Sequence, residues 1–287
     1  MKAPAVDYVA PHSLDEALQC LAGTDNARVL AGGQSLMAML NMRFAFPDCL
    51  VDINRIPELA YLRDEGDTIR IGAMTRQRDV EFSDLVRDRL PILREAILNV
   101  GHRQTRNRGT VGGSLCQLDP SAEIPTIAMA LDARVHVASA AGTRSLAMAD
   151  FPAGYMTPAL EADEMLVGVS MQPWEPGHGW SFLEFSRRHG DFAIASAAVL
   201  LRFGPDARVD RCSITLGGVS TAPVRMGQAE QALLGTKAEA ADIERAAALC
   251  GAVEASSDAY VPGWYRQRLA LVLSGRAITR ALERATR

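Results

Sequence analysis

The sequence predicts a mixed α+β protein built from three modules, and three observations lead to this prediction. An αβαβ pattern with short connections opens the chain, which implies parallel strands. Further along, segments at 134–139, 143–146 and 165–171 predict antiparallel strands joined by short turns. A segment rich in Pro and Gly at 172–179 then separates these elements from a last set of strands and helices.

Capping and apolar periodicity predict the first module, which we place at residues 1–57. Ser13 and Glu16 form a capping-box pattern ahead of an apolar helical stripe that ends near Gly23. Short apolar segments at 27–30 and 49–53 predict two buried strands, with a helix at 35–42 between them.

The second module is placed at 58–174 and the third at 175–287. In the second, we predict a strand at 68–73, a helix at 90–100, an Arg-rich loop at 101–109, and a helix that Asp119 and Pro120 open and that runs to about Leu131. In the third, we predict three strands and then helices, at 180–187, 193–203, 208–216, 227–234, 240–253 and 263–284.

Composition excludes several classes of function. The formal net charge of −4 argues against a nucleic-acid-binding protein. The five cysteines contain no CxxC pair, so the sequence predicts no metal site, no iron–sulfur cluster and buried thiols in a reducing compartment. No leader or membrane-spanning segment is predicted, and we therefore expect a soluble, cytoplasmic protein.

Two turns of small residues are the candidates for a binding site, at Ala31–Ser35 and Thr110–Ser114. Glycines let a backbone approach a phosphate closely, and free amides with nearby hydroxyl groups can bind an anion. Neither turn matches a Rossmann fingerprint or a P-loop. The alternative is that both are ordinary glycine turns.

Six ordered segments resemble one family, the FAD subunits of molybdenum hydroxylases, including medium subunits of aerobic carbon monoxide dehydrogenase and xanthine dehydrogenase. The two glycine segments are VLAGGQSL (Val29–Leu36) and RNRGTVGGSLCQLDPSAEIP (Arg106–Pro125). The others are FPAGYMTPALEADEML (151–166), RRHGDFA (187–193), GGVSTAPVR (217–225) and YRQRLALVLSGRAI (265–278).

The resemblance implies an FAD-binding fold of the vanillyl-alcohol oxidase type, with two α+β subdomains and a C-terminal domain of a small antiparallel sheet and helices. It implies that the two glycine segments hold the FAD pyrophosphate, that Glu123 lies near flavin hydroxyl groups, and that Phe192 lies near the isoalloxazine ring. The implied FAD-binding residues are Leu30, Ala31, Gly32, Gly33, Gln34, Ser35, Leu36, His102, Thr110, Gly112, Gly113, Ser114, Glu123, Leu166 and Phe192.

Several residues keep a second interpretation. Glu123 can be a first-turn helix carboxylate, Asp119 a helix N-cap, and Phe192 a core residue of a strand. The Arg-rich loop can be solvated, can balance the pyrophosphate charge or can dock a partner. Many relatives carry a Lys where this chain has Leu183 and Glu184, so tuning of the flavin by a lysine is not implied.

The resemblance also implies the function. We expect an electron-transfer flavoprotein subunit, without a catalytic residue of its own, that receives electrons from the [2Fe–2S] clusters of a small subunit. A large molybdopterin subunit would oxidise the substrate, in a heterotrimer or a dimer of heterotrimers. The alternatives are a self-sufficient flavin oxidoreductase and a non-catalytic nucleotide-binding or scaffold module.

Overall fold

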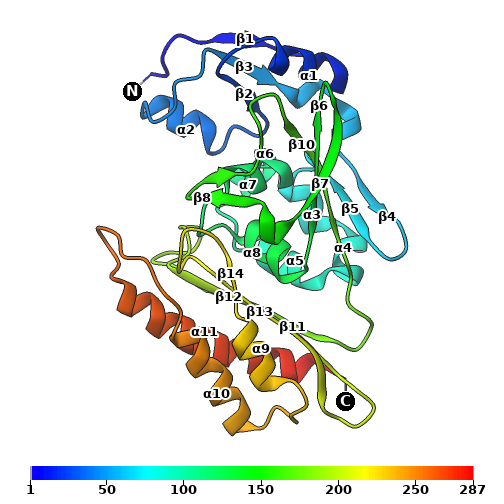
Figure 1. The fold of residues 1–287 in the computed structure, drawn as a ribbon, viewed down its shortest axis with the longest axis vertical. Coiled ribbons are helices and arrows are strands. Elements are labelled where there is room, and N and C mark those ends of the chain that lie inside the picture. The colour runs from blue at the N-terminus through cyan, green and yellow to red at the C-terminus, as the bar shows by residue number, and fades with distance from the viewer. Residues whose placement is uncertain (1, 287) are drawn as a thin grey trace.

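The computed structural model describes residues 2–286, arranged as three units along the long axis of the molecule (Figure 1). The N-terminal unit lies at one end, helices and a five-stranded sheet form the middle, and the C-terminal sheet with its helices lies at the other end. The α+β class is therefore confirmed. No helix in the described range is both long and apolar enough to span a membrane.

The N-terminal unit is a three-stranded parallel sheet with two helices. Its strands lie in the order β1-β3-β2, and the parallel pairing predicted for the second and third is confirmed. Ser13 accepts a hydrogen bond from the Glu16 amide and so caps α1 as predicted. The elements are β1 (Asp7–Val9), α1 (Leu14–Ala22), β2 (Ala27–Leu30), α2 (Leu36–Asn41) and β3 (Cys49–Asp52).

The middle unit pairs an antiparallel sheet, in the order β4-β5-β10-β6-β7, with six helices that enclose the largest apolar core. Its strands are β4 (Leu62–Asp64), β5 (Ile69–Gly72), β6 (Arg134–Ser139), β7 (Gly142–Ala147) and β10 (Met165–Met171), with a small hairpin of β8 (Pro152–Gly154) and β9 (Thr157–Pro158). Its helices are α3 (Gln77–Phe82), α4 (Asp84–Arg89), α5 (Pro91–Ile97), α6 (Arg103–Arg108), α7 (Val111–Gln117) and α8 (Glu123–Ala130).

The Arg-rich segment is a helix, α6, and the prediction of a loop was wrong. The physical reason is Arg106, which is buried rather than solvated. Its Nε lies 2.9 Å from Oε2 of Glu81, and its Nη1 donates to the carbonyl of Val100 at 3.0 Å. A guanidinium group that has hydrogen-bond partners inside the protein can be buried. A high density of arginines in the sequence is therefore not sufficient evidence for a solvated loop.

The start of α8 also differs from the prediction. The carboxylate of Asp119 accepts a hydrogen bond from the Ser121 amide at 2.9 Å, two residues along, which makes a side-chain turn. The helix therefore begins at Glu123 with Ala122 as its N-cap, and the N-cap interpretation of Asp119 was wrong.

The C-terminal unit is a four-stranded antiparallel sheet, in the order β11-β12-β13-β14, with three helices. Residues of β12 alternate between two cores: Ala197, Val199 and Leu201 face the C-terminal helices, whereas Ala198 and Leu200 join the middle core. The elements are β11 (Gly179–Phe185), β12 (Ala195–Phe203), β13 (Val209–Gly217), β14 (Val224–Arg225), α9 (Gly227–Leu233), α10 (Ala240–Gly251) and α11 (Gly263–Arg284).

Candidate functional site

The first glycine segment forms an open loop between β2 and α2. Gly33 has a φ of +72°, a conformation that glycine adopts at little cost. The four consecutive amides of Gly32, Gly33, Gln34 and Ser35 donate no hydrogen bond to any residue between 2 and 286. Backbone N–H groups that are left free in such a loop form a concave site for an anion. These four amides are therefore available to donate hydrogen bonds to a ligand.

Two residues that the sequence analysis missed hold this loop in place. Asn54 donates its Nδ2 hydrogen to the carbonyl of Ala31 at 2.7 Å. Arg76 donates from Nη2 to Oδ1 of Asn54 and from Nη1 to the carbonyl of Arg108, both at 2.6 Å. A signal for Asn54 exists in the sequence: it follows a buried strand that is parallel to β2, and the carboxyl ends of parallel strands meet at one edge. Arg76 has no comparable signal.

The second glycine segment is the start of helix α7, and the prediction of a second set of free amides was wrong. Thr110 is the N-cap, and its Oγ1 accepts from the Gly113 amide at 3.0 Å. The amides of Val111 and Gly112 donate to the carbonyls of Thr75 and Ala73 at 3.0 and 2.9 Å. These amides are occupied because β5 and the residues after it pass directly beside the helix end.

The role of glycine in this second segment is close packing. A Cβ on Gly112 would lie 2.8 Å from the Cα of Ala73, and a Cβ on Gly113 would lie 3.9 Å from the Cβ of Ala31. A Cβ on Gly32 would overlap the carbonyl oxygen of Arg108. The two glycine segments therefore come together in space, as predicted, and the half-buried Ser114 belongs to the same region.

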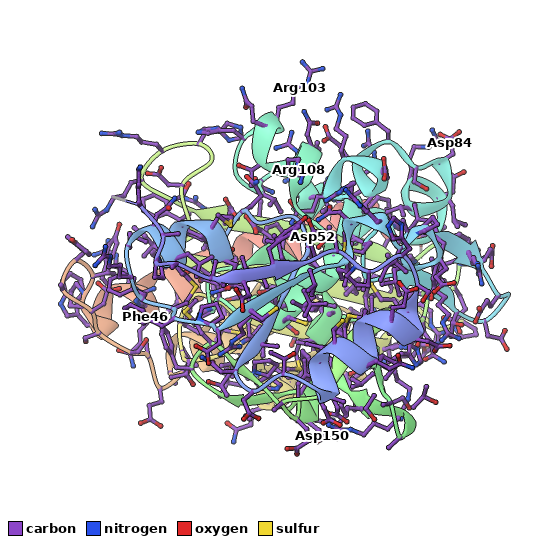
Figure 2. The ribbon with its side chains drawn as sticks, turned by 90° about the horizontal axis from the view of Figure 1, so that it is seen from above. Phe46, Asp52, Asp84, Arg103, Arg108 and Asp150 are labelled. Atoms are coloured by element: carbon purple, nitrogen blue, oxygen red, sulfur yellow. The ribbon has the colours of Figure 1, made fainter. Side chains whose placement is uncertain are left out.

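Basic residues near these segments differ in their surroundings. Arg106 is occupied by its ion pair with Glu81, so it has a structural role. Figure 2 shows Arg103 pointing outward from the edge of the molecule, and Arg108 on the side of Asp52. Burial opposes ionisation of Asp52, but hydrogen bonds from Tyr8 and Asn54, and the charge of Arg108, lower the pKa of its carboxyl group.

Glu123 occupies the first position of α8 and is buried, with 7% of its surface exposed. Burial, and then the carboxylate of Glu184, raise its pKa to about 8. Burial also raises the pKa of Asp119, although the Ser121 amide opposes that effect. Whether it is protonated or ionised, a carboxyl group at this position can form hydrogen bonds with hydroxyl groups of a ligand.

The other predicted residues have different environments, and Leu30 and Leu36, which flank the first glycine loop, are half-buried. Phe192 is 68% exposed on the loop between β11 and β12, so its interpretation as a core residue was wrong. His102 precedes α6 and contacts the same loop, because a Cβ on Gly190 would lie 2.5 Å from its Cε1 atom. Leu166 is buried in the middle core.

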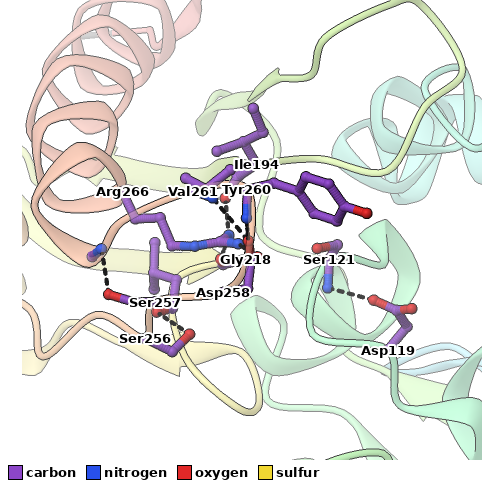
Figure 3. A network of polar contacts seen from close by, with 12 residues as sticks. Asp119, Ser121, Ile194, Gly218, Ser256, Ser257, Asp258, Tyr260, Val261 and Arg266 are labelled. Carbon is purple, nitrogen blue, oxygen red and sulfur yellow. Dashed lines mark hydrogen bonds and ion pairs between the residues drawn. The ribbon is translucent and has the colours of Figure 1, made fainter.

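Figure 3 shows how Arg266 of α11 connects the loops on this side of the molecule. Its guanidinium group donates to the carbonyl of Ile194 at 2.6 Å, to the carbonyl of Gly218 and to the carboxylate of Asp258. The Gly218 amide in turn donates to the carbonyl of Pro120 at 2.7 Å. One buried cation therefore links the loop that carries Phe192 with the turn that carries Asp119.

No group of three His, Cys, Asp or Glu side chains within residues 2–286 has a geometry that could hold a metal ion. Cys20, Cys49, Cys116, Cys212 and Cys250 are free thiols.

Two family models match this chain. The FAD-binding domain of molybdopterin dehydrogenases matches residues 4–173, and the C-terminal domain of the carbon monoxide dehydrogenase flavoprotein matches residues 180–281. The chain is 40% identical to subunit alpha of the 6-hydroxypseudooxynicotine dehydrogenase complex of Paenarthrobacter nicotinovorans, over 99% of this chain and 97% of that protein. It is 38% identical to caffeine dehydrogenase subunit beta of Pseudomonas sp. strain CBB1, with the same coverage of each chain.

A solved structure has the same fold. A chain of carbon monoxide dehydrogenase from Hydrogenophaga pseudoflava superposes with a TM-score of 0.96 at 35% identity, over 100% of both chains.

The geometry fits FAD, the cofactor that these matches indicate. The four free amides can donate hydrogen bonds to a pyrophosphate. A Cβ at Gly32 would prevent the close approach of the two glycine segments. On this evidence the chain belongs to the family of FAD-binding subunits of multi-subunit molybdenum-containing dehydrogenases.

Proposed function

We propose that this chain is the electron-transfer flavoprotein subunit of a molybdenum hydroxylase. It would receive electrons from [2Fe–2S] clusters of a small partner subunit and deliver them to an external acceptor. The observation that carries the proposal is the row of four free amides at Gly32–Ser35, packed against the start of α7 in a chain that matches the family over nearly its whole length.

The residues of this chain would bind and orient the cofactor. The amides of the first loop, with the hydroxyl groups of Ser35 and Ser114, would bind the pyrophosphate, and Glu123 would accept hydrogen bonds from flavin hydroxyl groups. FAD, when bound, supplies the redox chemistry, because it can accept and release electrons. We assign no catalytic residue to the chain itself.

The exposed Phe192 and the nearby His102 would lie beside the ring system. An aromatic residue on a loop that Arg266 anchors can cover a flavin and limit the access of water. Leu30, Leu36, Leu166, Gly112, Gly113, Thr110 and Gln34 complete the set of residues for which we propose a place at the cofactor.

The partners in this proposal are a large molybdopterin subunit and a small [2Fe–2S] subunit, in a heterotrimer or a dimer of heterotrimers. The relatives named above are subunits of dehydrogenase complexes, which supports a multi-subunit assembly. The division at 1–57, 58–174 and 175–287, the relation to the vanillyl-alcohol oxidase fold and the cytoplasmic location stay predictions.

The test separates this function from that of a self-sufficient flavin enzyme. The purified chain should contain FAD as its single redox centre and show an oxidised flavin spectrum without iron–sulfur features. Dithionite should reduce this flavin. Anaerobic mixing with carbon monoxide and a panel of N-heterocycles should leave it oxidised until both partner subunits are added.

Bleaching of the flavin by one of these compounds in the absence of partners would favour the self-sufficient enzyme. A colourless chain that takes up no FAD would contradict both the electron-transfer subunit and the self-sufficient enzyme. The remaining alternative would then be a scaffold module.

A further inference from the structure

Buried and half-buried polar side chains lie in a row across the C-terminal sheet, on the face toward α8. Glu184 of β11 lies opposite Ser196 of β12, which in turn lies opposite Gly217 of β13. Ser196 is 1% exposed, and its hydroxyl oxygen has no hydrogen-bond partner within residues 2–286. The Oε2 atom of Glu184 is also buried and without a partner in that range. Unpartnered oxygens are costly in a protein interior, so this row calls for an explanation.

The row continues onto α8 and reaches Glu123. A Cβ on Gly217 would contact both the Oγ of Ser196 and the Oγ1 of Thr126, so β13 and α8 touch at this position. Thr126 follows Glu123 by three residues on the same face of α8. Glu123 and Glu184 therefore lie on the two sides of this contact: Glu123 is one helical turn from Thr126 in the middle unit, and Glu184 is opposite Ser196 in the C-terminal unit.

The charges around this pair do not neutralise it. Neither carboxyl group forms an ion pair among the described residues. The charge of Asp119 disfavours ionisation of Glu123. The backbone amide of Glu123 itself, and then the charge of Arg106, which is already paired with Glu81, oppose that effect. Ser196 and Thr215 of the sheet are neutral side chains and add no charge that could balance the two carboxyl groups.

The other charged groups near this interface are engaged elsewhere. Glu95 of α5, which packs beside β11, is paired with Arg280 and Arg284 of α11. Arg266 of α11 bonds Ile194, Gly218 and Asp258. Burial raises the pKa of Glu184 to about 7, near that of Glu123.

We propose that Glu184 is a positioning residue of the flavin site, which shares one proton with Glu123 so that the pair carries a single negative charge when FAD binds. This inference rests on the proposed FAD site, and in particular on the contact between Glu123 and flavin hydroxyl groups. Two unpaired carboxylates in one buried space repel each other, whereas one shared proton satisfies both. The role acts through Glu123, and Glu184 need not touch the cofactor.

The proposal fixes the direction of a pH effect. Bound FAD excludes water from the pair and disfavours its second ionisation, so the complex holds the shared proton to a higher pH than the free chain does. The complex therefore binds more protons than the free chain as the pH rises through the titration range of the pair. By linkage, FAD affinity is highest at low pH and falls as the pH rises.

The experiment measures FAD affinity by fluorescence titration of the chain stripped of cofactor, from about pH 6 to about pH 9. We expect the wild-type affinity to fall ~10-fold, the effect of one pKa unit of difference between free and bound states. Glu184→Gln mimics the protonated acid at every pH. It should flatten this profile and bind FAD more tightly than the wild type at the alkaline end. Glu244→Gln, an exposed control in the same unit, should keep the wild-type profile.

The outcomes distinguish this inference from the proposed function. A wild-type chain that binds no FAD at any pH contradicts the proposed function. FAD binding with a flat wild-type profile, or the same slope in Glu184→Gln as in the wild type, overturns the proton-sharing role and leaves the proposed function intact. A gain of affinity at alkaline pH does not follow from a merely structural role, because a damaged fold weakens binding at every pH.

Discussion

At the scale of single residues, the glycines of the two segments have different physical tasks. Gly33 supplies a backbone conformation, with a φ of +72° that exposes consecutive amides. Gly32 and Gly112 supply space, since a methyl group on either would collide with the backbone of Arg108 or Ala73. The two segments look alike in sequence, but the first offers free hydrogen-bond donors and the second allows close contact between backbones.

Gly33→Val tests the loop that carries the free amides. A β-branched residue at this positive φ costs about 1–3 kcal/mol of stability and changes the direction in which the neighbouring amides point. We expect FAD affinity to fall at least ~100-fold, because hydrogen bonds to a charged group contribute about 1.5–3 kcal/mol each. Equilibrium titration with FAD, together with thermal denaturation, measures both effects.

Gly235→Val is the matched control, since Gly235 has a φ of +74° with no atom within 4 Å of an added Cβ. It should lose similar stability and keep its FAD. Stoichiometric FAD in the Gly33 variant would refute the assignment of this loop.

At the scale of elements, short loops from three parts of the chain depend on one residue of α11. Arg266 is 8% exposed and bonds groups at Ile194, Gly218 and Asp258. Gly218 is itself bonded to Pro120, next to the turn of Asp119. Loops with few apolar contacts of their own depend on such buried polar links for their order.

Arg266→Ala should release these loops. Removal of a buried cation leaves two carbonyls and a carboxylate without their donor, at a cost of about 3 kcal/mol. We expect faster amide hydrogen exchange in segments 186–194 and 254–262, with less change in α10. Arg268→Ala, two residues along the same helix on its exposed side, should leave exchange unchanged. Equal exchange in both variants would show that the apolar contacts of α11 hold the loops without Arg266.

At the scale of the whole molecule, the middle and C-terminal units share a core. Phe182, Ala198 and Leu200 of the C-terminal sheet pack with residues of α5 and α8, while the other face of the same sheet packs on α10 and α11. Ion pairs add to this interface, with Arg284 on Glu95 at 2.7 Å and Arg225 on Asp132 at 2.8 Å. Glu123 of the middle unit and Phe192 of the C-terminal unit are therefore carried by two units that share one core.

Adjacent residues of β12 allow a matched test. Leu200 and Leu201 are 1% and 0% exposed and point to opposite cores. Each Leu→Ala change should cost about 2–5 kcal/mol of unfolding free energy. Leu200→Ala should also accelerate hydrogen exchange in α8, whereas Leu201→Ala should do so in α10 and α11. The same exchange pattern in both variants would contradict the two-core arrangement.

Much of the fold follows from local sequence. Two of the parallel N-terminal strands, three strands of the C-terminal sheet and its three helices were predicted within a few residues, because apolar periodicity and caps are local signals. The short strands β1 and β14 were missed. The six-residue helices α3, α4 and α6 were missed, because so short a helix shows little periodicity and depends on tertiary contacts.

The sequence by itself determined the α+β class, the two glycine segments and the resemblance to flavin subunits, since each depends on the order and kind of neighbouring residues. The tertiary structure alone decided which glycine segment has free amides, that Asn54 and Arg76 hold it, and that Glu184 lies near Glu123. The physical reason is that a hydrogen-bond partner or a burial state belongs to a pair of groups. Such pairs are formed here by residues far apart in the chain, as Thr75 and Ala73 are from the α7 amides that they occupy.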